Sequence, residues 1–220
     1  MSRSLSTCGF PAASLILLLS ATTQAGVIST TGAVIAPSAI PSDLSQGALV
    51  SGTEISLFSE SMSVTTTESF TVDVIDTGRF DRVVDLSPHQ IGAGTYDAWL
   101  LHVGHLSGSG MPELQGSLTF DTDVVGIMVK STRMGGTDDL FGSAGTNYAT
   151  GASARGLELN QGDWLELSSD RRTVTVQFEI RTFIDEIRII TMASSETPVP
   201  GPAGLAALAG IAGIRSSRRR

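Results

Sequence analysis

The residues suited to metal binding or acid–base chemistry are three histidines and twenty-two acidic residues. His102 and His105 are three positions apart, a spacing that would place both side chains on one face of a helix. The segment from Trp99 to Val103 has the pattern of a strand, on which these side chains diverge, and zinc needs three or four converging ligands. His89 is isolated from both. The histidines therefore favour no metal centre.

A second candidate is the segment from Asp121 to Gly126, which begins like a calcium-binding loop. Asp121 and Asp123 stand at alternate positions, but Val125 occupies the third acidic position and the downstream bidentate glutamate is missing. The pattern favours a strand that bends at Asp121 to Asp123 and continues as another strand.

Asp138 and Asp139 are adjacent acids, and with Glu158 and Asp163 they would form a calcium site only if separate loops converge. The sequence does not show that convergence. Ca²⁺ is thus the one cofactor that the sequence leaves open, and its candidate ligands are Asp121, Asp123, Asp138 and Asp139.

Catalytic residues are not indicated by any motif. The chain has no Gly-x-Ser-x-Gly segment, and its single cysteine, Cys8, precedes an N-terminal apolar run. Glycoside hydrolysis needs two carboxylates about 5–10 Å apart across a cleft, and twenty-two acids always contain some such pair. We therefore predict that the protein is not an enzyme.

Aromatic side chains offer flat apolar faces on which sugars stack. Trp99 and Trp164 lie within apolar strand patterns, which favours packing in the core, and Tyr96 begins one of these strands. Tyr148 lies in a loop rich in Gly, Ala and Thr, and we expect it to be exposed.

The elements that must position these residues read as strands throughout residues 26–192. Residues 173–180 alternate without a break, which places Val174, Val176, Phe178 and Ile180 on a buried face and polar residues on a solvated one. Denser apolar runs at 96–103 and 124–129 are typical of central strands covered on both sides. A single helical turn, Asp138 to Phe141, is expected after Thr137. Gly-rich and Pro-containing turns separate the runs, so we predict an all-β, antiparallel β-sandwich or jelly-roll-like single domain.

The N-terminal residues 1–25 have the three parts of a signal peptide. Arg3 provides the positive region, an apolar core includes Leu15 to Leu19, and Thr23-Gln24-Ala25 provides small residues for cleavage after Ala25. The apolar run of about ten residues is too short to span a bilayer. Cleavage by signal peptidase would remove Cys8, so the mature body would contain no cysteine.

The C-terminal residues form a second processing segment. A linker and proline motif at 193–202 is followed by an apolar stretch at 203–214 and a basic end at 215–220. A helix of twelve residues is about 18 Å long and marginal as a permanent anchor, and terminal arginines favour a transient insertion with the end inside. The motif residues are Pro198, Val199, Pro200, Gly201 and Pro202, and the basic residues are Arg215, Arg218, Arg219 and Arg220.

This tail resembles a PEP-CTERM sorting segment, in a short arginine-ended variant with Pro198-Val199-Pro200 in place of the usual Pro-Glu-Pro. The resemblance implies processing by an exosortase-type membrane enzyme and delivery to the cell surface or extracellular matrix of an exopolysaccharide-producing bacterium. Segments within residues 90–192, such as Gly94 to His102, resemble the extracellular β-domains found ahead of such tails, a group that implies no activity for individual positions.

The net charge of the body also limits which partners it can bind. Without both ends, nine basic and twenty-two acidic residues remain, a net charge of minus thirteen, which argues against nucleic acid as a partner. We therefore predict an exported surface or matrix protein, membrane-associated before processing, with a structural or adhesive role associated with exopolysaccharide. The alternatives are a carbohydrate-binding module, with or without calcium, then a glycoside hydrolase, and an ice-binding protein, for which Thr65 to Thr67 alone is too small a face.

Overall fold

The computed structural model describes residues 26–104, 113–150, 155–179 and 184–194. The predicted signal peptide, proline motif, apolar stretch and basic end lie outside these residues, as do His105 and Ile180. The described chain is mostly β, with antiparallel sheets and two short helices, which confirms the all-β prediction. Within these residues no helix has both the length and the apolar character needed to cross a bilayer.

The first five-stranded sheet is antiparallel throughout and is formed by strands from distant parts of the chain. Strand β13 alternates along its length, with Val174, Val176 and Phe178 fully buried, as predicted. The strand order is β1 (Val27–Gly32), β9 (Glu113–Phe120), β13 (Thr173–Glu179), β12 (Trp164–Leu167) and β6 (Gly78–Phe80).

The second five-stranded sheet is antiparallel except where its short edge strand β2 pairs with β4. Its central strand β8 is buried from residue 96 to residue 103, as expected of a strand covered on both faces. The strand order is β10 (Val124–Met128), β14 (Asp185–Met192), β8 (Gly94–Val103), β4 (Ser56–Thr66) and β2 (Ser38–Ala39).

The prediction of a central position is wrong for residues 124–129, since β10 ends the sheet order. This strand is nevertheless apolar because other parts of the chain cover it. Val74 pairs with Ile127 across the free edge, and a Cβ on Gly126 would lie 2.8 Å from Val72.

Two hydrophobic clusters lie on opposite faces of β8. Trp99 and Leu101 belong to a cluster that also contains residues of the first sheet, including Phe120, whose ring centroid is 5.8 Å from that of Trp99. Ala98 and Leu100 belong to a second cluster with residues of the smaller elements. These elements are β3 (Asp43–Leu44) with β11 (Asn147–Tyr148), β5 (Phe70–Val72) with β7 (His89–Ile91), α1 (Ser131–Gly135) and α2 (Asp138–Phe141).

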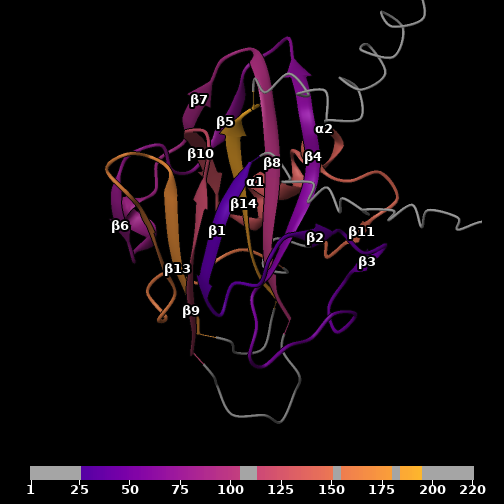
Figure 1. Cartoon of the computed structure of the whole chain (residues 1–220), viewed down its shortest axis with the longest axis vertical. Helices are drawn as coiled ribbons and strands as arrows, with labels where there is room; N and C mark the ends of the chain where they lie inside the picture. Colours follow the sequence, from indigo (N-terminus) through magenta and orange to yellow (C-terminus); the bar gives the residue numbers. More distant parts are fainter. Residues whose placement is uncertain (1–25, 105–112, 151–154, 180–183, 195–220) are drawn as a thin grey trace, which may run out of the picture.

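The short elements cover the second sheet on the side where Figure 1 shows α2 beside β4. The predicted turn at Asp138 to Phe141 is present as α2, and Thr137 precedes it, but the threonine hydroxyl makes no capping bond. It donates to the carbonyls of Arg133 and Met134 in α1 instead. Thr137 therefore ties the two helices together over the sheet. A 3-10 turn, η1 (Val83–Asp85), completes the elements.

Candidate functional site

A chain of buried charged side chains crosses the second sheet, from β4 through β14 to β8. Arg188 on β14 has no exposed surface, and its guanidinium donates to both carboxylate oxygens of Glu60 on β4, at 2.6 and 2.8 Å. Tyr148 donates its hydroxyl to the same Glu60 carboxylate at 2.7 Å. Burial and the nearby Glu60 carboxylate raise the pKa of Tyr148.

Asp138 at the start of α2 links the ion pair of Glu60 and Arg188 to a second ion pair, that of Arg155 and Glu186. Its carboxylate accepts from Arg188 at 2.7 Å and from Arg155 at 2.9 Å. Arg155 also donates to Glu186 at 2.5 Å, and His102 shares a hydrogen bond with the other Glu186 oxygen at 2.8 Å. From Glu60 through Arg188, Asp138 and Arg155 to Glu186 the charges alternate in sign, which is how buried charges are tolerated.

The charged residues of β14 alternate with apolar ones. Glu186 and Arg188 alternate with Ile187 and Ile189, a pattern that is also typical of a strand with one solvated face. Each of the four residues is fully buried, because α2 and the segment that carries Arg155 cover the charged face. The network is a structural feature that fixes loops on the sheet, and its carboxylates are already engaged by guanidinium groups.

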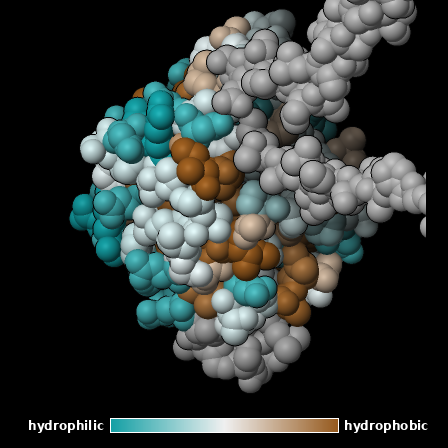
Figure 2. Space-filling model, in the orientation of Figure 1, coloured by the Kyte–Doolittle hydropathy of each residue, from teal (hydrophilic) through white to brown (hydrophobic). Residues whose placement is uncertain are grey.

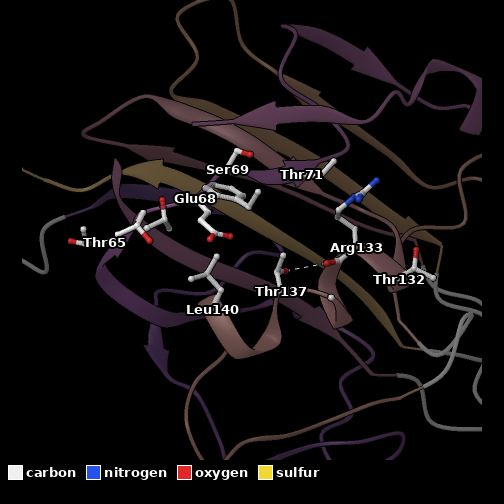
Figure 3. Close-up of a pocket in the computed structure, with 12 residues that line it drawn as sticks. Thr65, Glu68, Ser69, Thr71, Thr132, Arg133, Thr137 and Leu140 are labelled. Carbon is white, nitrogen blue, oxygen red and sulfur yellow. Dashed lines mark hydrogen bonds between the residues drawn. The ribbon is translucent and has the colours of Figure 1, made fainter. Parts of the chain in front are cut away.

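A polar pocket of about 480 Å³ lies between the turn after β4 and the α1–α2 segment. Figure 3 shows Glu68 and Leu140 on one side of it and Arg133 and Thr132 on the other. Glu68 is exposed, and Arg133 is partly engaged by Asp73 at 3.4 Å. The remaining lining combines the ring of Phe70 with side chains that carry hydroxyl groups, which are Thr65, Thr66, Thr67, Ser69 and Thr71. The hydroxyl of Thr137, which also lines the pocket, is engaged by α1 and Arg188.

A cluster of three carboxylates lies at the opposite end of β14 from Met192. Glu158, Asp163 and Asp185 each offer one oxygen, and these oxygens lie within 4.8 Å of one another. Asp163 immediately precedes β12, and its two oxygens accept from the backbone N–H groups of Glu158 and Glu179, both at 2.7 Å. These two bonds fix the Asp163 carboxylate between the 158–163 segment and the end of β13.

Asp185 is the most perturbed member of this cluster. Its side chain is only 1% exposed, and among the described residues no donor reaches its Oδ2. Burial, with the nearby charges of Asp163, Glu158 and Glu186, raises the pKa of Asp185 to about 9. Burial also raises the pKa of Asp163. At neutral pH without a counter-ion, Asp185 therefore holds a proton.

The calcium candidates of the sequence lie elsewhere and have other partners. Asp121 accepts from Gly26 N–H at 3.0 Å and from the Ser194 hydroxyl, and Asp123 forms an exposed ion pair with Arg172 at 3.1 Å. These two aspartates form the bend between β9 and β10 that the sequence favoured.

Asp138 belongs to the buried network, and Asp139 beside it is exposed. Of the four carboxylates considered for a site assembled from loops, Glu158 and Asp163 do come together, but their third member is Asp185.

The predictions for the aromatic side chains are partly confirmed and partly wrong. Trp99 is fully buried in the cluster that contains both sheets, as predicted. Trp164 is 8% exposed but belongs to neither cluster, and the guanidinium of Arg79 lies over its ring, 4.1 Å from the centroid. Tyr96 is also buried and meets Phe70 edge-on. The prediction of an exposed Tyr148 is wrong, since it is 9% exposed and lies beneath the guanidinium of Arg155, 4.7 Å from its ring centroid.

No protein-family model, no curated protein and no solved structure matches this chain. The face in Figure 2 is mainly hydrophilic on the left, with small hydrophobic areas near the middle. Exposed apolar residues such as Ile28 and the adjacent Val83 and Val84 are ordinary for a protein surface.

Sequence reasoning missed Asp185, Glu60, Arg155 and Arg188 as functional or structural partners. One signal was present: Asp185-Glu186-Ile187-Arg188 places three charged residues at the start of a strand whose later residues are apolar. Such a density of charge on a strand this apolar indicates paired charges, although it does not name their partners.

Proposed function

We propose that this chain is an exported, non-enzymatic protein of the cell surface or extracellular matrix, sorted through its PEP-CTERM-type tail and adhesive toward polysaccharide. Signal peptidase and an exosortase-type enzyme would remove its two ends, and the tail would enter the membrane only during sorting. Its two five-stranded sheets pack as a β-sandwich, a proposal supported by the cluster to which both contribute.

The observation that carries this proposal is that both ends of the described body meet at one carboxylate. Asp121 accepts from the backbone N–H of Gly26 at 3.0 Å and from the hydroxyl of Ser194 at 3.1 and 3.2 Å. The backbone of Ala193 also bonds to Thr95 on β8. Removal of residues 1–25 and of the tail would therefore leave a closed body whose ends are already fastened together.

Gly26 is suited to be a new N-terminus. Cleavage after Ala25 would turn its N–H into an ammonium group beside Asp121, and a charge-assisted bond of this kind is about twice as strong as a neutral one. Its φ of +122° and its approach to Trp99, where a Cβ would lie 2.3 Å from the ring, require glycine at this position.

Polysaccharide binding is supported by the chemistry of the pocket between β4 and α1. Sugars present hydroxyl groups that both donate and accept, and this pocket offers many hydroxyl groups with one carboxylate, Glu68, and one guanidinium, Arg133. Leu140 adds an apolar surface that is 37% exposed. The pocket has a volume of about 480 Å³, which is typical of a site that binds a small molecule.

We expect Glu68→Ala to weaken binding of the native exopolysaccharide by at least about tenfold, because a hydrogen bond to a charged group contributes about 1.5–3 kcal/mol. Isothermal titration of the purified body with oligosaccharides cut from that polymer measures the change. Glu68 is exposed and no described hydrogen bond depends on its side chain, so the melting temperature should change little.

The matched control is Glu54→Ala, which removes an equally exposed acid just before the other end of β4. Equal binding by the Glu68 and Glu54 variants would contradict the pocket proposal. Release of new reducing ends from the polymer by the wild-type protein would contradict the non-enzymatic role and favour a hydrolase.

A further inference from the structure

We propose that Glu158, Asp163 and Asp185 bind one divalent cation, with Ca²⁺ preferred, which joins the segment before β12 to the start of β14. The inference does not depend on the proposed function, since this cluster lies at the opposite end of β14 from Ala193 and the fastened chain ends.

The spacing of the three oxygens fits a calcium coordination shell. Ca²⁺ binds oxygen ligands at about 2.3–2.6 Å, so two ligands on opposite sides of the ion are at most about 5 Å apart. The three carboxylate oxygens lie within 4.8 Å of one another, which allows all three to contact one ion. Mg²⁺ demands near-ideal octahedral geometry at about 2.0–2.1 Å and is usually bound through one or two carboxylates, whereas Ca²⁺ takes more oxygen ligands in a more flexible geometry.

The unpartnered oxygen of Asp185 is an independent indication of a ligand. A buried carboxylate oxygen normally accepts a hydrogen bond, and leaving it without one is costly. Asp185 is 1% exposed, and within the described parts of the chain its Oδ2 has no partner. Asp185 is one of the three carboxylates whose oxygens converge, so a cation bound there would give this carboxylate the partner that the described residues do not.

Backbone hydrogen bonds hold the other two proposed ligands, Asp163 and Glu158, in place. Asp163 uses one lone pair on each oxygen to accept from Glu158 and Glu179 N–H groups, which leaves a further lone pair on each for a metal. Glu158 belongs to a tight turn closed by the bond from Gln161 N–H to its carbonyl, and it is only partly buried. A cation and its remaining water ligands can therefore approach from the Glu158 side.

The alternative is that Asp185 is simply a neutral buried acid. Its raised pKa is consistent with that state in the absence of an ion, and a cation would reverse it by favouring the ionised carboxylates. The two states differ in one measurable respect. Only the cation site gives a stability that depends on Ca²⁺ concentration.

The test is a titration of the full purified protein, stripped with EDTA and dialysed, with CaCl₂ alone at pH 7.5. We expect one binding event by calorimetry and a melting temperature that rises by about 5–10 °C at a hundred times Kd. Asp185→Asn should eliminate both the binding heat and the shift. Asp139→Asn and Asp123→Asn, which remove exposed acids outside the cluster, should leave both unchanged.

If Asp185→Asn does not fold, Glu158→Gln is the second variant, and we expect it to lose Ca²⁺ binding in the same way. Glu158 is only partly buried, so this substitution should disturb the fold less. A wild-type protein that neither binds Ca²⁺ nor melts at a higher temperature with it would overturn the site. Binding that survives both substitutions would place the ion elsewhere, and an equal response to MgCl₂ would overturn the calcium preference. Loss of polysaccharide binding alone would leave this inference untouched.

Discussion

Metal-free protein is expected to lose stability steadily as the pH rises from about 4 toward 9, and Asp185→Asn should remove most of that loss. Burial and three neighbouring acids raise the pKa of Asp185 from 3.8 in the unfolded chain to about 9 in the folded one. Between these values the folded state holds one proton more than the unfolded state, so the free energy of unfolding falls with pH.

The expected slope is up to about 1.4 kcal/mol per pH unit over the part of this range in which only the folded state is protonated. Asp163 has a pKa that burial raises in the same direction, so it adds to the loss. Glu158 and Glu186 also face Asp185 and oppose its ionisation. Asparagine has a similar shape and no charge, so it keeps the packing and removes the titration.

The measurement is urea unfolding of wild type and Asp185→Asn in EDTA at several pH values between 4 and 9. The variant should be the more stable protein at pH 8 without metal, and the difference should shrink toward pH 4. Asp139→Asn is the control, since it makes the same substitution at an exposed position outside the cluster. If the free energies of unfolding of the wild type and Asp185→Asn differ by the same amount at every pH, this account of Asp185 is wrong.

Arg188→Met should destabilise the body by about 3–5 kcal/mol, because it removes one partner of a buried ion pair. Arg188 is fully buried and satisfies both oxygens of Glu60, one oxygen of Asp138 and the carbonyl of Met134. Methionine fills much of the volume but leaves Glu60 as a buried charge whose one remaining partner among the described residues is Tyr148.

Chemical denaturation with circular dichroism measures this change, and Arg82→Met is the matched control. Arg82 forms an ion pair with Asp85 at 3.0 Å, but its side chain is 64% exposed, so its loss should cost less than about 1 kcal/mol. The double variant Glu60→Met with Arg188→Met should recover part of the stability. Equal effects of the Arg188 and Arg82 substitutions would show that the buried network does not stabilise the fold.

The sequence predicted the fold class because alternation is a local property. Residues 173–179 have the period of two that a half-buried strand requires, and the structure has that strand with the predicted faces. The order of the strands in the sheets could not be predicted from local patterns, because β1 pairs with β9 and β4 pairs with β8 across long stretches of chain. Residues 124–129 were misplaced because an edge strand covered by other segments has the same pattern as a central one.

The candidate sites were less predictable for the same reason. Glu158 and Asp163 lie just before β12 of the first sheet and Asp185 begins β14 of the second, so a local pattern does not show that the three come together. Tyr148 was expected in solvent because its loop is rich in small residues, but two arginines and Glu60 require a buried partner there. Local patterns indicate which face of a strand is buried by apolar residues, and they do not reveal a face buried by paired charges.

The central claim is that the body works outside the cell after both ends have been removed, and the mass of the native protein tests it most directly. Intact mass spectrometry with mapping of the terminal peptides, on protein taken from the surface of the cell that makes it, should find an N-terminus at Gly26 and a C-terminus near Pro198. A soluble, uncut chain of 220 residues recovered from the cytoplasm of that cell would contradict the account.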